Sequence, residues 1–584
     1  MIRLRKNILS ILLLSLLGPL QAQEQKDIGT ETVTVVKPYS PTVSDAFKLK
    51  SSPVLDDSIV LQKKKIDYNI FSVPVASTFT PAKGKAARVK KTPPPRLFNS
   101  YASVGLGNFN NALLDLYTSR ELNRGEDLFD IGLRHHSSRG DIESTPLDAN
   151  FYDTKLEGSY AKKNRDMEWG AGLEFQHQLY NWYGVAQEEF DPALISGLDE
   201  TQNYFSIGAT ADIEMEDGFF KKGNLLLRRF WDATESGENR IVVQPTIELP
   251  ITDELVTIGT KLDYVSGNFE NESLNSTVNT MGSNYSHFQV GVTPSLLILR
   301  DDLTLNLGAS LVYGLDTENS DSQFFIYPSV TASYRVVEDN VIAYGGIEGK
   351  LRQNSYYDLV AENPFVSPTL EIQPTDQQYD AYIGLKGQLL PNLGYNLKGS
   401  YTAENRRPLF LLNPENTLRT DDSGYFLGNS FQVFYDDIKT LGFFGELNLD
   451  INRNFTLGMN VEFYDYDTET DNPAWNLPNI KGALFMDYQI DENWFVGGNL
   501  FYVGEREDLE AQAIANATPS EFPAAIISLD AFFDANLQAG YRFNEQLTIF
   551  VKASNLANND YQRWANFRVQ GFQALAGVSY KFDM

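Results

Sequence analysis

The sequence predicts an all-β protein, a transmembrane antiparallel β-barrel of about 22 strands with short periplasmic turns and long extracellular loops. Three observations indicate this fold. Apolar and polar residues alternate with period two in many segments; in 303–313, Leu303 and Leu305 share one face while Thr304 and Asn306 share the other. These segments are about 10–15 residues long, enough to cross a bilayer at a tilt. The segments are joined alternately by tight turns and long loops, as in outer-membrane barrels.

Residues 1–22 are predicted to be a secretory signal peptide. A head with three basic residues precedes an apolar stretch over 8–17, and Ala22 supplies a small residue at the expected cleavage site. A transmembrane anchor is the alternative, but about ten apolar residues are too few to cross roughly 30 Å of hydrocarbon. No cysteine follows the site, which excludes a lipid anchor on an N-terminal cysteine.

Residues 99–584 are predicted to form the barrel as a single domain. A soluble antiparallel sheet with one wet face would show the same alternation in any one segment, so the assignment depends on length, number and connection. An even strand number is required when both ends of a barrel lie in the periplasm. The expected strands cover 100–108, 112–122, 127–138, 150–163, 168–183, 202–215, 219–233, 239–249, 254–267, 285–299, 303–316, 323–336, 341–353, 378–389, 393–405, 425–450, 455–466, 480–490, 494–505, 529–543, 547–558 and 570–582.

The connections fall into two classes, which would lie at opposite ends of the barrel. Tight polar turns are expected around Asp253-Glu254, Asp301-Asp302, Glu338-Asn340, Pro391-Asn392, Asn452-Asn454, Asp491-Asn493 and Asn544-Gln546. Long loops are expected near 184–201, 268–284, 354–377, 406–424, 466–479, 506–528 and 559–569.

Composition argues against most enzyme classes and against nucleic-acid binding. The 584 residues include no cysteine and only four histidines, so thiolate chemistry and His-rich metal sites are poorly supplied. The net charge of −29 disfavours sequence-independent binding to nucleic acid. The adjacent His135 and His136 would point to opposite faces of a strand and could not chelate one ion in regular geometry. Loop carboxylates such as Asp508 show no fixed calcium-loop spacing. We therefore expect no enzyme, no cofactor and no metal site.

Aromatic residues suggest two further features. Those near strand ends are expected to form interfacial girdles, although ordinary β-propensity could also explain them. These residues are Trp169, Trp182, Tyr183, Trp494, Tyr541 and Phe543. Aromatics in the expected loops could stack on sugars or cap a ligand pocket, or could seal the loops against one another. These residues are Tyr356, Tyr357, Phe365, Trp475, Trp564 and Phe567.

The C-terminal segment carries a family resemblance. Residues 576–582 alternate and end in Tyr580 and Phe582, which resemble the terminal strand that outer-membrane insertion machinery recognises. Upstream, the run 552–556 followed by Tyr561 resembles the last hairpin of TonB-dependent receptors, the 22-stranded transporters of Gram-negative outer membranes. The resemblance implies an outer-membrane barrel and, as a partner during insertion, the barrel assembly machinery.

An N-terminal stretch extends this resemblance. Glu31, Thr32, Val33, Thr34, Val35 and Val36 follow the expected cleavage site and resemble the TonB box. In the family, this extended segment pairs with the energy-coupling protein TonB by β-addition. On its own the stretch is a weak signal, because six alternating residues of this type could belong to any strand.

Residues 23–98 depart from the family pattern. TonB-dependent receptors carry a folded plug before the barrel, whereas 37–98 is Pro-rich and is expected to be extended chain. A barrel of this size without a plug would leak, so we expect that this segment, inward-folded loops or another envelope protein blocks the lumen. Residues 58–98 carry nine basic residues against one acidic residue, which suggests a minimal plug at an acidic periplasmic mouth; a solvated linker is the alternative. The basic residues are Lys63, Lys64, Lys65, Lys83, Lys85, Arg88, Lys90, Lys91 and Arg96.

Two functions fit these features. One is a receptor-like barrel that uses TonB to take up a ligand captured by its outer loops. The other is a structural or assembly component of an outer-membrane complex, which kept the barrel and lost the plug. A passive porin is disfavoured, because porins usually have about 16–18 strands.

Overall fold

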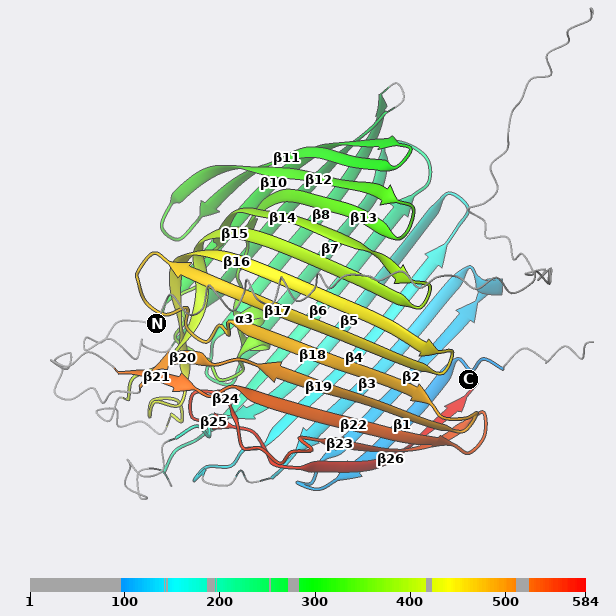
Figure 1. Cartoon of the computed structure of the whole chain (residues 1–584). Helices are drawn as coiled ribbons and strands as arrows, with labels where there is room; N and C mark the ends of the chain where they lie inside the picture. The colour runs from blue at the N-terminus through cyan, green and yellow to red at the C-terminus, as the bar shows by residue number, and fades with distance from the viewer. Residues whose placement is uncertain are drawn as a thin grey trace, which may run out of the picture. The chain divides into compact units, whose positions relative to one another are not determined.

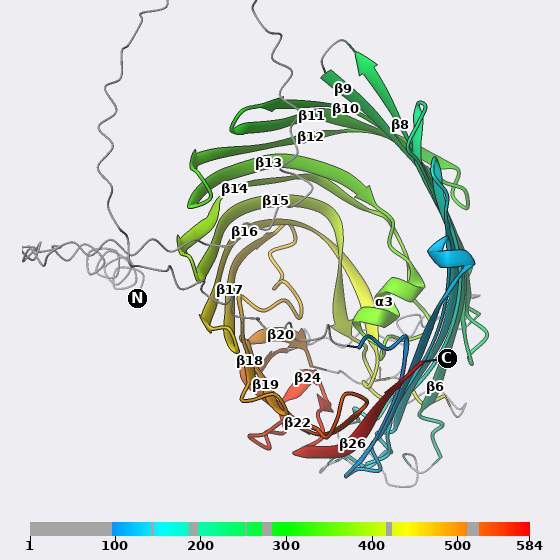
Figure 2. The same ribbon diagram turned by 90° about the vertical axis from the view of Figure 1, so that its right-hand side faces the viewer.

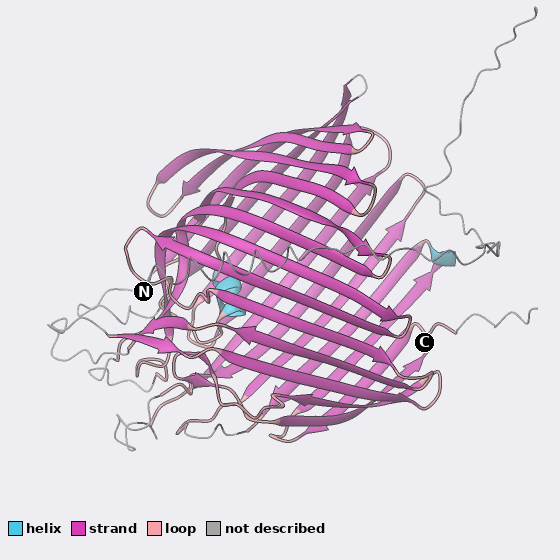
Figure 3. Cartoon of the chain, viewed as in Figure 1, coloured by secondary structure: helices cyan, strands magenta, loops and turns pink. Residues whose placement is uncertain are grey.

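The computed structural model describes residues 96–583, apart from 141, 143–144, 186–194, 196, 252–253, 271–282, 416–422 and 511–524. Twenty-two strands form one antiparallel sheet (Figures 1 and 3). Each strand pairs with its neighbours along the chain, and β1 pairs with both β2 and the last strand, β26, so the sheet closes on itself. The predicted fold class, a 22-stranded antiparallel barrel, is confirmed.

The wall strands follow the chain in order. They are β1 (Ser100–Gly107), β2 (Ala112–Leu122), β3 (Asp127–Ser138), β4 (Phe151–Lys163), β5 (Met167–Asn181), β6 (Thr201–Met215), β7 (Phe220–Asp232), β8 (Gly237–Ile251), β9 (Glu254–Asn268), β10 (Asn284–Arg300), β11 (Leu303–Asp316), β12 (Asp321–Val337), β13 (Val341–Arg352), β14 (Thr375–Leu390), β15 (Leu393–Leu412), β16 (Phe431–Asn452), β17 (Phe455–Thr468), β18 (Ile480–Gln489), β19 (Trp494–Val503), β22 (Phe532–Arg542), β23 (Leu547–Ser554) and β26 (Gln573–Phe582).

The remaining elements lie in the connections. They are η2 (Asn123–Gly125), α3 (Tyr356–Glu362), the hairpin β20 (Arg506–Leu509) with β21 (Ile526–Leu529), and the hairpin β24 (Gln562–Trp564) with β25 (Phe567–Arg568). Apart from η2, they belong to the long-loop end of the barrel. Every one of the 22 predicted segments corresponds to a wall strand.

The period of two separates the two faces of the wall. Large apolar side chains lie exposed on the outer face, including Leu173, Ile326 and Ile383, the last with 74% of its surface accessible. Inward positions are polar; for example, the Tyr117 hydroxyl donates to Asp130 across the inner wall. An apolar outer face with a polar lumen is the arrangement that lipid requires of a barrel. Among the described residues, no helix is long and apolar enough to span a membrane.

Two predicted boundaries were wrong, the start of the loop 406–424 and the start of the strand 425–450. The expected loop 406–424 begins too early, because β15 continues to Leu412 and pairs with β16 as far as Phe431. A bulge at Arg406, where φ is 54°, shifts the register and lets the strand continue. The side chains beyond it, such as Leu409 and Phe410, are buried, so packing at the mouth extends this strand. The start expected for the next strand, residue 425, lies instead in a buried loop before β16.

The girdle prediction holds only in part. Trp494 and Phe543 lie exposed at the short-turn end, and Trp494 packs on Tyr541 with ring centroids 4.8 Å apart. Trp182, in contrast, is only 2% exposed and belongs, together with Tyr183, to an internal cluster at the opposite end. These two residues are therefore not interfacial anchors, because they pack on loops and face away from lipid.

Candidate functional site: the long-loop end of the barrel

The long loops gather inside the long-loop end of the barrel. Viewed from the short-turn end, α3, β20 and β24 lie within the outline of the wall (Figure 2). Their apolar side chains form one buried cluster, which we call the cap core. It comprises Leu147, Trp182, Val185, Ile195, Tyr204, Phe230, Val265, Phe269, Tyr285, Tyr356, Leu359, Val360, Phe365, Val366, Leu370, Ile372, Phe410, Leu412, Tyr425, Phe426, Leu427, Phe431, Leu529, Trp564, Ala565 and Phe567.

The loop aromatics thus take the sealing role. Tyr356 and Phe567 have no accessible surface, and Trp564 is 9% exposed within the same core. Phe365 stacks on Phe567 with centroids 3.9 Å apart. Trp475 is buried in a neighbouring apolar cluster with Leu409. Side chains buried at this depth hold loops together and are not available to stack on a ligand.

Helix α3 is the main inward element of the loop after β13. The Ser355 hydroxyl caps its N-terminus by accepting from the backbone N–H of Asp358, and the helix ends before Asn363 and Pro364. Three of its side chains, Tyr356, Leu359 and Val360, are buried. A seven-residue helix is too short to be stable alone, so its contacts with the wall must hold it.

Two buried carboxylates of the wall fix the start of this helix. Glu238 accepts hydrogen bonds from the Tyr356 backbone N–H and from the Tyr285 hydroxyl, the latter at 2.7 Å. Asp232 accepts from the Tyr356 hydroxyl, also at 2.7 Å. Burial raises the pKa of Tyr356 well above its ordinary value, so this phenol stays protonated and donates.

Ionic contacts fix the exposed side of the helix. Asp358 pairs with Arg240 at 2.9 Å, and Arg240 in turn forms two hydrogen bonds of 3.0 and 3.1 Å with Asp263 of β9. The Arg228 guanidinium lies 3.6 Å from the centre of the Tyr357 ring. A bidentate arginine and a cation–π contact both prescribe geometry, so the helix is held in one orientation.

The loop before β16 joins the cap through backbone contacts. Asn429 donates to the carbonyl oxygens of Trp182 and Gly424, each at 2.6 Å. Ser423 forms a parallel bridge with Asp199. A β-carbon at Gly424 would lie 2.1 Å from the Asp199 carbonyl oxygen, so this approach requires glycine. Loops far apart in sequence therefore meet backbone to backbone.

The β20–β21 hairpin carries two buried ionisable residues, Arg506 and Asp508, into the cap. Asp508 accepts from the Leu412 backbone N–H at 3.0 Å and from the Asn476 amide at 2.7 Å. Arg506 donates to the carbonyl oxygens of Gln562 and Arg563. Burial raises the pKa of Asp508 to about 6 and lowers that of Arg506 to about 10. The two carboxylate oxygens of Asp508 therefore hold the hairpin to β15 and to Asn476.

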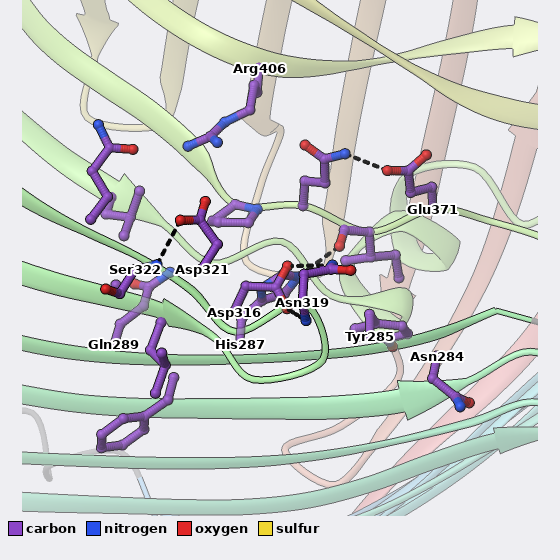
Figure 4. A pocket seen from close by; sticks show the side chains of 18 of the residues that line it. Asn284, Tyr285, His287, Gln289, Asp316, Asn319, Asp321, Ser322, Glu371 and Arg406 are labelled. Atoms are coloured by element: carbon purple, nitrogen blue, oxygen red, sulfur yellow. Dashed lines mark hydrogen bonds between the residues drawn. The ribbon is translucent and has the colours of Figure 1, made fainter.

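A polar cavity of about 320 Å³ lies beside the cap, between the inner face of β10–β13 and residues 370–374 (Figure 4). Arg406 of β15 reaches in from one side, and Asp316 and Asn319 at the β11–β12 turn form part of its rim. His287 donates through Nε2 to the Ile372 carbonyl oxygen at 2.8 Å, which ties the wall to the loop. The sequence did not single out this cavity, because its residues come from five separate segments.

The residues singled out in the sequence lie elsewhere. Glu31–Val36 and the basic residues from Lys63 to Lys91 lie outside the described residues. Arg96 is described and pairs with Asp583 at 2.6 Å at the exposed C-terminal end. Tyr580 and Phe582 lie on β26 at the seam with β1, with rings 6.2 Å apart. Within the described part of the chain, no group of three or more His, Asp or Glu side chains could hold a metal ion.

Comparison with known proteins supports the fold and no closer relationship. No protein-family model and no curated protein sequence matches the chain. The siderophore receptor PirA from Acinetobacter baumannii has a similar structure, with a TM-score of 0.62 and 12% identity over 83% of this chain and 81% of that one. The FrpB iron transporter from Neisseria meningitidis gives a TM-score of 0.62 and 12% identity over 83% and 82%.

A third structure of the same kind is the outer-membrane ferripyoverdine receptor of Pseudomonas aeruginosa. Its TM-score is 0.57, with 14% identity over 84% of this chain and 72% of that one. The resemblance to TonB-dependent receptors is thereby confirmed at the level of the fold. The chain has the 22-stranded antiparallel barrel fold that these siderophore receptors share, and its long loops pack into a buried core at one end of the barrel.

Proposed function

We propose that the protein is a receptor-like barrel that captures a ligand at its extracellular mouth and takes it up with energy from TonB. The observation that carries the proposal is the mouth itself, where a built cap and a polar cavity of about 320 Å³ occupy the long-loop end of the barrel. The structurally similar proteins are described as siderophore receptors and an iron transporter, which supports uptake as the general activity.

Energy coupling would use Glu31–Val36. Pairing by β-addition requires backbone N–H groups, so proline within the stretch should block it. The test is photo-crosslinking of the full-length protein to TonB in cells, comparing Val33→Pro with Ser44→Pro outside the stretch. Crosslinks should disappear only in Val33→Pro. Equal crosslinking in both variants would contradict energy coupling through Glu31–Val36.

The second candidate function is a structural or assembly component of an outer-membrane complex. The observation that favours it is the way α3 is held, by two buried carboxylates and by the Asp358–Arg240–Asp263 chain. Loops held in place by such contacts could obstruct the mouth without a moving plug. Mild detergent extraction followed by mass spectrometry tests it: stoichiometric envelope partners would favour the component, and isolation of the protein alone would favour the receptor.

We further propose that the basic segment, Lys63 to Arg96, lies across the periplasmic mouth of the barrel. Charge supports this proposal. Residues 1–98 have a net charge of +9 and the whole chain has −29, so residues 99–584 have a net charge of −38. Deleting 58–95 and measuring single-channel conductance tests it. Conductance should rise; unchanged conductance would mean that the cap alone closes the lumen.

The C-terminal strand would serve as the insertion signal for the barrel assembly machinery. Tyr580 and Phe582 lie at the C-terminal end of β26. Before β26 pairs with β1, this aromatic strand would be free to bind the assembly machinery. Replacing both residues by Ser should leave the protein in the periplasm in a cell-fractionation assay. Normal insertion of this variant would contradict the assignment.

A further inference from the structure

The cavity beside the cap has a composition that points to a class of ligand. Its mouth lies at the β11–β12 turn, where Asn319, Asp321 and Gln323 are exposed, so it opens at the long-loop end of the barrel. Its volume, about 320 Å³, falls at the lower end of the range for small-molecule sites, roughly 300–1,000 Å³.

The three carboxylates at the cavity are engaged in local turns. Asp316 accepts from the backbone N–H groups of Glu318 and Asn319, each at 3.0 Å, and from the Asn319 amide at 2.9 Å. Asp321 accepts from the Ser322 backbone N–H at 2.8 Å, and Glu371 accepts from the Gln373 amide. These contacts shape the rim, and the negative charge of the three carboxylates disfavours an anionic ligand.

Amide side chains dominate the remaining polar lining. Five of them line the cavity: Asn284, Gln289, Asn319, Gln323 and Gln373. Three of these amides donate within the protein, Gln289 to Gln353, Asn319 to Asp316 and Gln373 to Glu371, which leaves their carbonyl oxygens as acceptors. Asn284 and Gln323 add amides that can both donate and accept, which suits a ligand whose groups also do both. Hydroxyl groups have this property, whereas a metal ion or a phosphate would not use the amide donors and acceptors together.

Arg406 supplies the one Lys or Arg side chain among the described lining residues. Its backbone is anchored on both sides, because its N–H donates to Asp437 at 2.8 Å and its carbonyl accepts from Thr375 at 2.8 Å. Its φ of 54° is unusual for a residue with a side chain. The guanidinium Nε is buried and has no partner among the described residues. An Nε this buried cannot meet a ligand directly, so a ligand oxygen would be bound by the terminal amino groups of the guanidinium, which lies at the cavity.

The floor of the cavity is apolar. Phe325, Leu351, Leu370 and Ile372 are buried there, next to the amides. Sugars present this combination of hydroxyl groups on the edges and C–H groups on the ring faces. We propose that the cavity binds the end of a neutral saccharide, with Arg406 donating to a ring or hydroxyl oxygen. The proposal rests on the proposed capture of a ligand at the mouth and specifies the ligand's class.

The test uses the purified full-length barrel in detergent. The protein is screened on a glycan array, and the selected saccharide is then titrated by calorimetry, with inorganic phosphate and citrate as anionic probes. Arg406→Gln should weaken saccharide binding roughly tenfold, because it removes a charged donor. Gln323→Trp should abolish binding by filling the space across from Gly314. Arg352→Gln, an arginine outside the cavity lining, should bind as the wild type does.

Each other outcome is informative. Absence of any saccharide signal, or full binding by Gln323→Trp, overturns the proposal even if Arg406→Gln fails to fold. Binding of phosphate or citrate alone, lost in Gln323→Trp, would overturn it in favour of an anion site. Saccharide binding in vitro without uptake by cells would leave the site standing and contradict only the uptake function. Uptake of some ligand without saccharide binding would contradict the saccharide site and leave the uptake function standing.

Discussion

The wall and the cap of this barrel use opposite hydrophobic arrangements in one chain. In the wall, large apolar side chains such as Ile383 lie outside and polar ones such as Asp130 lie inside. In the cap, Tyr356 and Phe567 are inside, together with buried polar groups such as Asn429 that join the loops by hydrogen bonds. The wall faces lipid and needs only a period of two, whereas the cap faces water and needs a core. Contact with lipid therefore places apolar side chains on the outside of the wall, and contact with water places them in the interior of the cap.

The largest expected effect comes from removing the cap's central element. Replacing residues 355–373 by a flexible Gly/Ser linker deletes α3 and much of the cap core while the wall hydrogen bonds stay in place. Single-channel conductance in a planar bilayer should rise from near zero to that of a wide pore. A linker inserted in the 317–320 turn is the control. Closed channels in the deletion variant would show that the other loops suffice.

A charge on the wall should distinguish lipid from water as its surroundings. Ile383→Arg places a cation in the middle of β14 on the outer face, where it should cost about 2–4 kcal/mol. The protein is folded into lipid vesicles at a series of urea concentrations and followed by tryptophan fluorescence. The difference between the two variants gives the loss in folding free energy. Lys386→Arg on the same strand is the control. A cost close to zero would mean that this face is wet.

The cap should be sensitive to a single methyl group at its closest backbone approach. Gly424→Ala would place a β-carbon 2.1 Å from the Asp199 carbonyl oxygen, and relieving that overlap should cost about 1–3 kcal/mol. Gly394→Ala, where the nearest atoms lie 3.9 Å away, is the matched wall variant. Limited proteolysis on whole cells should cut the cap faster only in Gly424→Ala. Equal cutting rates would contradict the backbone contact.

Strand β8 carries one glutamate that holds α3, Glu238, and another at its far end, Glu248, so the effects of replacing the two can be compared. Glu238→Ala leaves the Tyr356 N–H and the Tyr285 hydroxyl without their acceptor, which should destabilise the docked helix by about 1–3 kcal/mol. Glu248→Ala lies on the same strand at the other end. Hydrogen exchange at residues 356–362 should quicken in the first variant and not in the second.

The smallest effect is a pH dependence within the cap. The pKa of Asp508 rises from 3.8 to about 6 on burial, so between these pH values the docked hairpin holds a proton that the undocked hairpin releases. Docking should therefore strengthen by about 1 kcal/mol as the pH falls from 7 to 5. The protection factors at residues 506–509, which are corrected for the intrinsic pH dependence of amide exchange, should rise accordingly. Asp508→Asn should show no such dependence; if it keeps the dependence, another group is responsible.

The sequence predicted the wall far better than the cap, for a physical reason. Alternation is local, so a segment such as 303–316 reveals its strand without its neighbours. The cap depends on residues such as Asp232, Glu238 and Tyr356, which meet across more than a hundred positions. No period relates them. The clue that could have been used was the excess of aromatics in the loops, which favoured sealing once the lumen was expected to lack a plug.

The cavity was equally hidden, and its central residue shows why. Arg406 lies in a stretch that resembled a loop, with two arginines and Pro408 in succession. The bulge that turns its guanidinium inward depends on Asp437 and Thr375, which belong to neighbouring strands. Such a conformation is set by tertiary contacts and leaves no mark on local composition.

The seam between β1 and β26 has a consequence for biogenesis. The first and last strands pair along Ser100–Gly107 and Leu575–Phe582, so the cylinder can seal only after the ribosome has released the whole chain. Until then two unpaired edges persist, and each one would aggregate in the periplasm without protection. Loss of the final ten residues would therefore leave a curled, open sheet, however well the other strands had formed.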